Sequence, residues 1–326
     1  MTVEKLLERG EAAMLVRNWE VLLDCARRLQ MARHPQGYTF QAFAQRSQGQ
    51  LDAAIETLRK GVRQLPREME LRHELVETLF QAQRYAEVLD TVDECLQLPF
   101  IRAIDILTLT GQKVRALMSL QRYEDALQVI DQTLPRVEPE LKELPIALLK
   151  PMRASVQIEM RDFEGARETI HNMETLIQQS PDLKWMLQHQ IYTLRAQILY
   201  EEKGDEENAR RLAREALNLR RVHPPALALL YKLSPPVEGT VYTYQVGIES
   251  MVPEPETGDF APRVTIYTVV ARSEEEAKQL ALAYETDADE RSIDVFLCEQ
   301  VGESQNAPVG VLDAYEEFVD DLEEEE

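Results

Sequence analysis

A seven-residue phrase recurs along the first two-thirds of the chain. It reads RNWEVLL at 17–23, GQLDAAI at 49–55, QRYAEVL at 83–89 and QRYEDAL at 121–127, with looser copies at 161–167 and 204–210. Repetition at intervals of roughly 20 to 50 residues is typical of repeat proteins, in which each unit packs only on its neighbours. We therefore expect a stacked array rather than one globular core over this part of the chain.

One position in each phrase sets the register of the repeat. It is occupied by Leu22, Ala54, Val88, Ala126, Ala166 and Ala209, at intervals of 32, 34, 38, 40 and 43 residues. Each phrase begins a segment with helical periodicity, and we expect each of these helices to end near a proline, because proline cannot continue a helix. The prolines concerned are Pro35, Pro66, Pro99, Pro135, Pro181 and Pro224.

This pattern resembles the tetratricopeptide-repeat (TPR) family, whose unit of about 34 residues is a helix A, a short turn and a helix B. The resemblance covers residues 3–224 and implies an α-solenoid of five or six helical hairpins, closed by a capping helix at 226–233. In that family a large turn residue packs on a small residue three positions later. The corresponding aromatics here are Trp19, Tyr85, Tyr123 and Phe163, which we expect to be buried between paired helices. Pro145 and Pro151 predict a kink or a displaced start in the fifth helix A.

The resemblance also implies a binding groove, because helix A of each unit lines the concave face of a TPR stack. In this register the groove residues are Met14, Phe40, Phe43, Arg46, Phe80, Arg115, Met118, Met152, Ile158 and Tyr200. Aromatic and methionine side chains favour an apolar or amphipathic segment as ligand. The alternative is that individual members belong to the core between helices. The family's clamp for C-terminal carboxylates uses lysine and asparagine, whereas the matching positions here hold Leu7, Glu11, Thr39, Phe43, His73 and Glu77, which argues against that ligand.

The charge of the chain is concentrated in its last quarter. Residues 1–235 contain 32 Lys and Arg against 34 Asp and Glu, a net charge of -2, whereas residues 236–326 contain 4 against 24, a net charge of -20. We place the boundary between two domains at Pro235-Pro236, where the helical pattern stops. The acidic segment should repel nucleic acid and anionic membranes and attract a basic protein surface.

The acidic segment 236–326 predicts a small α/β domain of order β-β-α-β-α. Apolar residues alternate along 242–248 and again along RVTIYTVVA at 263–271, which is typical of strands. Ser273 with Glu276 forms a capping box at the start of a helix, and a third strand is expected at 293–298. This order implies a hairpin followed by one right-handed crossover.

The end of the chain, GVLDAYEEFVDDLEEEE, predicts an amphipathic acidic helix. Its apolar residues include Leu312, Tyr315, Phe318, Val319 and Leu322, separated by acidic residues. The helix would either cover one face of the small sheet or dock in a groove, that of its own chain, a second copy or a partner. Self-association is therefore one of the possibilities.

A basic cluster precedes the acidic domain in the sequence. It consists of Arg210, Arg211, Arg214, Arg220 and Arg221. Either the acidic domain docks on this cluster through exposed charges that salt would screen, or charge repulsion keeps the domain extended.

The strong sequence signatures of enzymes are missing from this chain. It contains no GK[ST] phosphate loop, no glycine-rich dinucleotide turn, no HExxH and no GxSxG. The three cysteines, Cys25, Cys95 and Cys298, are far apart, and the five histidines occur singly, so we expect neither a metal nor a cofactor. The N-terminus is acidic rather than basic and apolar, which predicts a cytoplasmic protein.

These observations favour a non-catalytic scaffold or adaptor for protein–protein interactions. Its groove would bind an apolar or amphipathic segment, with the acidic domain as a second contact or regulator. The alternative is that the acidic domain imitates nucleic acid and occupies a basic site on a nucleic-acid-binding protein.

Overall fold

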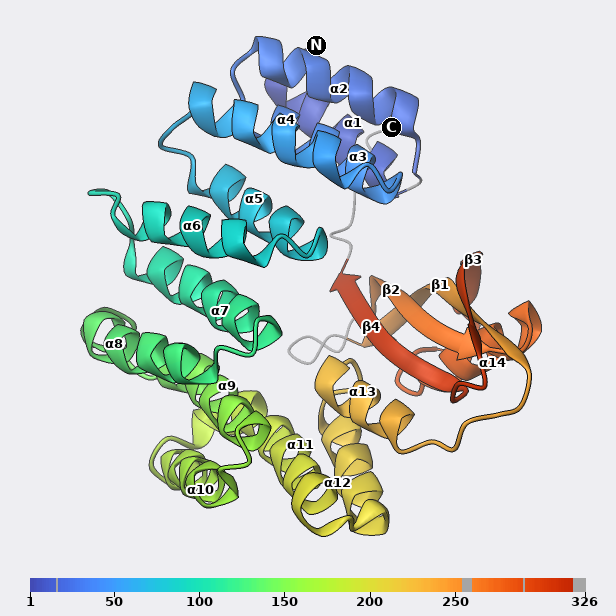
Figure 1. The fold of residues 1–326 in the computed structure, drawn as a ribbon. Helices are drawn as coiled ribbons and strands as arrows, with labels where there is room; N and C mark the ends of the chain where they lie inside the picture. Colours follow the sequence, from blue (N-terminus) through green and yellow to red (C-terminus); the bar gives the residue numbers. More distant parts are fainter. Residues whose placement is uncertain (16, 254–259, 290, 319–326) are drawn as a thin grey trace. The chain divides into compact units, whose positions relative to one another are not determined.

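The computed structural model describes residues 1–15, 17–253, 260–289 and 291–318. The chain forms two compact units, Met1–Met160 and Arg161–Glu326, which are described separately below. The first unit is helical. The second contains further helices and a four-stranded sheet (Figure 1).

The first unit is a row of helices joined by short turns. These are α1 (Val3–Leu15), α2 (Trp19–Met31), α3 (Gln36–Ser47), α4 (Leu51–Gln64), α5 (Met69–Gln81), α6 (Tyr85–Leu96), α7 (Ala103–Ser119), α8 (Tyr123–Leu141) and α9 (Leu144–Glu159). Each odd-numbered helix packs against the even-numbered helix that follows it, up to α7 and α8, and against the one before it. The predicted helix A–turn–helix B repeat is confirmed, with odd numbers as helix A and even numbers as helix B.

The register residues of the repeat lie in the first turn of each helix B. Leu22, Ala54, Val88, Ala126, Ala166 and Ala209 are all fully buried. At the four positions where it is alanine, this small side chain lets helix A and helix B approach closely, so that the larger neighbours interdigitate. The turn aromatics Trp19, Tyr85, Tyr123 and Phe163 are only half-buried, so the prediction that they are buried is wrong. They are the first residues of α2, α6, α8 and α10, and part of each side chain stays exposed.

Each turn between helix A and helix B has one residue in the left-handed region, five positions before the register residue. These residues are Arg17, Gly49, Gln83, Gln121, Arg161 and Gly204, with φ between 53° and 75°. A left-handed residue reverses the chain within very few residues. For a residue with a β-carbon this conformation costs about 1 to 2 kcal/mol, so the four non-glycine turns are held in place by the packing on either side.

Two glycines of the first unit are expected to respond oppositely to alanine. Gly49 has φ +75° and open space around its α-carbon, so Gly49→Ala should destabilise the unit by about 1 kcal/mol through the backbone alone. Gly111 lies inside α7, and an added β-carbon would meet only the Met152 sulfur at 3.8 Å. Gly111→Ala should therefore stabilise the unit by up to about 1 kcal/mol. Denaturant unfolding of both variants tests this, and shifts of the same sign would contradict the turn geometry.

The proline of the fourth repeat does not act as expected. Helix α8 continues through Pro135 and Pro139 to Leu141, so the prediction that Pro135 ends it is wrong. The reason lies in packing beyond the proline, where Val137 is fully buried. Helix α9 begins at Leu144 with Pro145 in its first turn, a position where proline's missing donor costs nothing.

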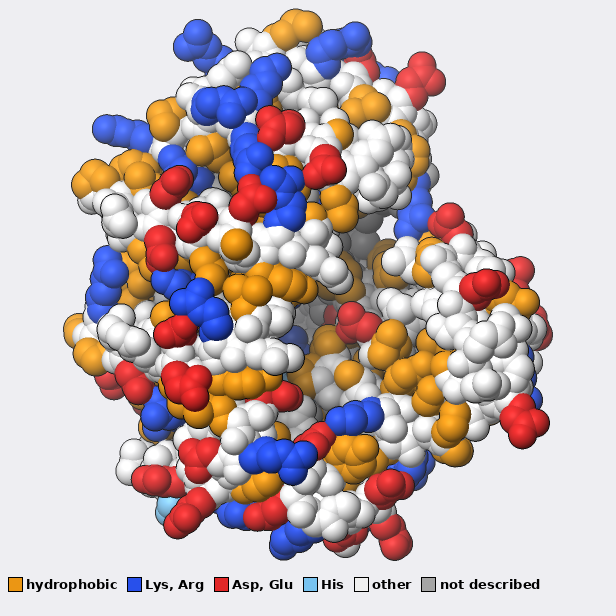
Figure 2. Space-filling view, in the orientation of Figure 1, with side chains coloured by type: hydrophobic (Ala, Val, Ile, Leu, Met, Phe, Trp, Pro, Cys, Tyr) orange, Lys and Arg blue, Asp and Glu red, His pale blue; other side chains and the backbone are white. Residues whose placement is uncertain are grey.

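Ion pairs connect neighbouring helix B elements on the surface of the first unit. Figure 2 shows basic and acidic side chains interleaved over α4 to α6. Arg59 of α4 reaches Glu87 of α6 at 2.6 Å, and Arg84 reaches both Glu87 and Asp52. Exposed pairs of this kind contribute little each, so they fix the register of the repeats more than they stabilise them.

The second unit begins with helices and then changes to strands. Its elements are α10 (Phe163–Gln179), a 3₁₀ turn (Pro181–Leu183), α11 (Lys184–Lys203), α12 (Glu206–Leu219), α13 (Pro224–Lys232), β1 (Thr240–Pro253), β2 (Phe260–Ala271), α14 (Glu274–Leu282), β3 (Asp294–Gln305) and β4 (Gly310–Phe318). Helices α11 and α12 form a hairpin. Leu229 and Leu233, in and just after α13, pack on the alanines of that hairpin, and α13 also contacts β4.

The sheet has the strand order β3-β1-β2-β4, and every neighbouring pair is antiparallel. Strands β1 and β2 form the expected hairpin. Strands β2 and β3 run in the same direction with β1 between them, and α14 lies in the connection that crosses over. Val246 and Tyr267 at the centre of the sheet are fully buried, together with Ala277 of α14 and Leu227 of α13. The sheet, α13 and α14 therefore share one core.

The predicted C-terminal helix is wrong, because residues 310–318 form strand β4, paired with β2. The order is thus β-β-α-β-β. Thr268 of β2 pairs with Asp313 of β4, but Val269 pairs with Val311, so Leu312 has no partner residue on β2. Because of this extra residue, Val311 and Ala314 both point into the core. This bulge gives the strand a spacing of three, which the sequence shows as helical periodicity.

The apolar residues assigned to that helix are distributed as follows. Leu312 is half-buried, and the Tyr315 side chain is 64% exposed. Phe318 ends β4, while Val319 and Leu322 lie outside the described residues. Because residues 310–318 form strand β4, they do not provide the helix that was expected to dock.

Candidate interaction surface

Consecutive helix A elements of the first unit lie side by side. The packed pairs are α1 with α3, α3 with α5, α5 with α7, and α7 with α9. Arg46 of α3 forms an ion pair with Glu74 of α5 at 2.9 Å, and His73 of α5 lies 3.4 Å from Asp105 of α7. We call the accessible face of α3, α5, α7 and α9 the helix A row.

Phe80 is at the centre of the helix A row. The Arg115 guanidinium of α7 lies over its ring, 4.3 Å from the centroid, and also reaches Glu77 at 3.4 Å. The Tyr85 ring packs against the other edge of Phe80, with centroids 5.3 Å apart. A cation over an aromatic face contributes about 0.5 to 1 kcal/mol at an exposed site and fixes the orientation of both groups.

The structure brings together part of the predicted groove. Phe43, Arg46, Phe80, Met118 and Met152 are half-buried on α3, α5, α7 and α9, and Arg115 is exposed among them. Phe80, Met118 and Met152 pack on one core cluster, and Phe43 with Met14 packs on another nearer the N-terminus. One edge of each side chain stays accessible, which is what a ligand would need.

Three predicted residues lie elsewhere. Phe40 is buried under α1, where its ring lies so close to Gly10 that a β-carbon there would be 2.1 Å away. Ile158 is buried near the end of α9. Tyr200 belongs to the second unit, where Lys232 lies 4.8 Å from its ring centroid. Phe40 and Ile158 are core residues, whereas Phe43, three residues after Phe40, is accessible.

An ionised carboxylate lies between α5 and α7 behind the row. Asp105 is buried, and the hydrogen bond from the Arg102 side chain lowers its pKa although burial opposes this. It also accepts a hydrogen bond from the backbone of Arg102, forming a capping box at the start of α7. Asp105 therefore has a structural role in positioning α7.

The second unit contains a buried network of ion pairs that was not predicted from the sequence. Arg263 of β2 reaches Glu285 at 2.6 Å and Asp287 at 2.8 Å, and its side chain is 2% exposed. Arg221, between α12 and α13, reaches Glu285 at 2.7 Å and Glu316 of β4 at 2.8 Å. The Glu285 side chain is 0% exposed, so both arginines are needed to compensate its charge.

The network connects the end of the helical array to the sheet. Tyr267 donates a hydrogen bond to Glu285 at 2.7 Å, and burial raises the pKa of this tyrosine. Burial opposes ionisation of Asp287, but the hydrogen bond from Arg263 and the charge of Arg221 outweigh it and lower its pKa. Tyr267 is therefore protonated and Asp287 ionised at neutral pH.

One member of the predicted basic cluster thus contacts the acidic domain, in a different manner from the exposed contact considered from sequence. The Arg221 side chain is only 12% exposed, so salt should have little effect on this ion pair. The sequence signal that could have revealed the network is Arg263, a lone arginine inside a run of β-branched and aromatic residues.

Within the described ranges, no group of three or more His, Cys, Asp or Glu side chains is placed to hold a metal ion. Among the same residues, no helix is both long and apolar enough to cross a membrane.

No protein-family model matches this chain, and no curated protein matches its sequence. Solved structures do match it. The chain is similar to TPR proteins.

Three of these structures show the extent of the similarity. The thermophilic TPR protein TTC0263 of Thermus thermophilus is 17% identical, with 57% of this chain and 92% of that chain covered and a TM-score of 0.41. PilF of Pseudomonas aeruginosa is 14% identical, with 69% and 94% covered and a TM-score of 0.46. A TPR protein of Parabacteroides merdae is 16% identical, with 71% and 98% covered and a TM-score of 0.38. These similarities concern the helical fold.

Proposed function

We propose that this TPR-like protein is a non-catalytic interaction scaffold that holds an apolar or amphipathic segment of a partner protein on the helix A row. The observation that supports this most directly is the Phe80 cluster, an aromatic ring fixed by Arg115 and Tyr85 with one edge accessible. Aromatic, methionine and arginine side chains are enriched at protein interfaces and carry much of their binding energy.

The chemistry of the row fits such a ligand. Phe80, Met118 and Met152 offer apolar area, and the methionines can adapt to different side chains. Arg46 and Arg115 are paired with Glu74 and Glu77, so they contribute orientation and hydrogen bonds more than net charge. The segment would therefore be bound mainly by burial of its apolar side chains.

Phe80→Ala is expected to weaken binding at least about tenfold, because a desolvated aromatic anchor contributes about 1.4 kcal/mol or more. The ligand for this measurement is a peptide selected from a random displayed library against the intact chain, with affinity measured by titration calorimetry. Selected peptides should be enriched in large apolar residues.

Phe100→Ala is the matched control, since Phe100 is an exposed aromatic in the loop before α7, outside the row. It should leave the affinity unchanged. Equal affinities of the two variants, or selected peptides without apolar residues, would move the binding site away from the row.

We propose further that the acidic domain serves as a second contact, for a basic protein surface. Exposed carboxylates on three strands support this, namely Glu249 of β1, Asp294 and Glu303 of β3, and Asp313 of β4. The alternative, in which this surface imitates nucleic acid, rests on the same charges. A variant with all four neutralised to amides should bind an oligo-lysine peptide more weakly and with a smaller dependence on salt. An unchanged salt dependence would contradict both the contact with a basic protein surface and the imitation of nucleic acid.

A further inference from the structure

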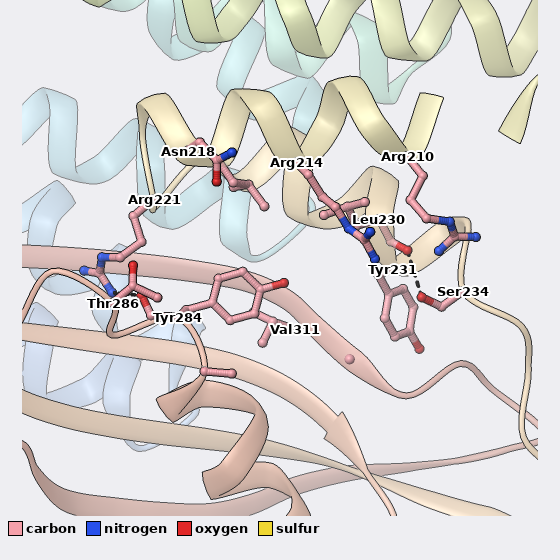
Figure 3. Close-up of a pocket in the computed structure, with 13 residues that line it drawn as sticks. Arg210, Arg214, Asn218, Arg221, Leu230, Tyr231, Ser234, Tyr284, Thr286 and Val311 are labelled. Atoms are coloured by element: carbon pink, nitrogen blue, oxygen red, sulfur yellow. Dashed lines mark hydrogen bonds between the residues drawn. The ribbon is translucent and has the colours of Figure 1, made fainter. Parts of the chain in front are cut away.

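A cavity of about 420 Å³ is lined entirely by residues of the second unit. Its walls come from α12, α13, the segment after α14 and the start of β4 (Figure 3). Helix α13 packs on both α12 and β4, so these walls are held together by tertiary contacts of one unit.

The cavity is basic although the domain beside it is strongly acidic. Arg210, Arg214 and Arg221 line it, and none of its described lining residues is acidic. Arg221 is engaged by the buried carboxylates, and Arg210 donates to the Leu233 carbonyl oxygen at 2.5 Å. For Arg214, by contrast, no carboxylate of the described chain lies within ion-pair distance. Its five N–H donors are available to a ligand.

Two tyrosines add neutral donors to the same cavity. Figure 3 shows the Tyr284 ring extending into the space between α12 and β4, with Tyr231 on the far side of Arg214. Burial raises the pKa of both hydroxyls, so both are protonated at neutral pH, although the charge of Arg214 acts in the opposite direction on Tyr284. Neither hydroxyl has a hydrogen-bond partner within the part of the chain that is described.

Apolar side chains form the remaining wall. Leu217 of α12, Leu230 of α13, Ala283 after α14 and Val311 of β4 line the cavity beside the polar groups. A cavity with one cationic end and one apolar wall favours an organic anion over an inorganic one, because an inorganic ion would leave the apolar wall in contact with water.

We propose that this cavity is a binding site for a small organic anion, a phosphate or carboxylate attached to an aromatic or aliphatic body. The guanidinium of Arg214 binds the anionic group with two parallel N–H donors, and the hydroxyls of Tyr284 and Tyr231 donate to its remaining oxygens. The body of the ligand packs on Leu217, Leu230 and Val311. This site is independent of the proposed peptide-binding function.

The test is titration calorimetry of the intact chain with three probes, phenyl phosphate, benzoate and inorganic phosphate. Phenyl phosphate or benzoate should bind saturably and at least about fivefold more tightly than inorganic phosphate, because only they cover the apolar wall. Whichever of these two probes binds more tightly shows whether the site prefers a phosphate or a carboxylate.

Arg214→Ala should weaken that binding at least about tenfold, and Tyr284→Phe, which keeps the ring, should weaken it about three- to tenfold. Arg211→Ala is the matched control, since Arg211 lies on the same helix, outside the cavity, and pairs with Glu215 at 2.6 Å. It removes the same charge and should have little effect. Absence of saturable binding by every probe, or equal losses in Arg214→Ala and Arg211→Ala, would overturn the proposal.

Discussion

Replacing Arg263 with alanine is expected to lower the free energy of unfolding of the second unit by about 3 to 5 kcal/mol. Arg263 reaches two carboxylates, and the one at 2.6 Å belongs to Glu285, whose side chain is completely buried. Removing the guanidinium leaves a buried negative charge with Arg221 as its remaining cation. Arg263→Ala should therefore unfold at a clearly lower temperature in calorimetry.

Arg272→Ala is the control for this measurement. Arg272 comes from the same acidic domain but is well exposed, 3.8 Å from Glu276, so its removal should cost less than about 0.5 kcal/mol. Adding Glu285→Gln to Arg263→Ala should recover part of the loss, because it removes the buried carboxylate charge that Arg263 had helped to compensate. An Arg263→Ala protein that unfolds like the wild type would show that the network does not hold the unit together.

Lowering the pH from 7.5 to 5 is expected to destabilise the second unit by about 3 to 4 kcal/mol through two buried histidines. His189 of α11 and His223, before α13, pack edge to face with ring centroids 4.6 Å apart. Burial, with a contribution from the charge of Arg220, lowers the pKa of His189 to about 4, and burial together with the charges of His189 and Arg220 lowers that of His223 to about 3.

The direction in which pH changes the stability of the second unit follows from these pKa values. In the unfolded chain both histidines have a pKa of about 6.5, so below that pH the unfolded state binds protons that the folded state does not. The stabilisation is complete above about pH 6.5 and is lost progressively as the pH falls toward 4 and 3. Between pH 7.5 and 5, His189→Gln/His223→Asn should show a smaller loss of stability than the wild type. His171→Gln, at an exposed site, should behave as the wild type does; equal pH dependence in all three proteins would contradict a buried neutral pair.

The repeat was predictable because its geometry depends on a few residues. A fully buried apolar residue at the register position and a left-handed turn residue five positions earlier define each hairpin, and both can be recognised in the sequence. The functional face was less predictable. Phe40 and Phe43 are three residues apart on α3, and a small rotation of the helix decides which of them is core and which is accessible.

The sheet domain shows a different limit. The bulge in β4 places Val311 and Ala314 on one face, and this spacing cannot be distinguished from a helix without knowledge of the partner strand. The Arg221–Glu285 pair joins residues 64 apart in sequence. Such contacts follow from the tertiary packing of α12, α13 and the sheet rather than from any local pattern.

The central claim, that the helix A row binds an apolar segment, is tested most directly by photo-crosslinking. A peptide selected against the intact chain carries a benzophenone at its most apolar position, and the crosslinked residues are identified by mass spectrometry. The proposed function predicts crosslinks to α5, α7 and α9 around Phe80, Met118 and Met152, and their loss in competition with unlabelled peptide. Competable crosslinks confined to α4, α6 and α8, or to the second unit, would contradict it.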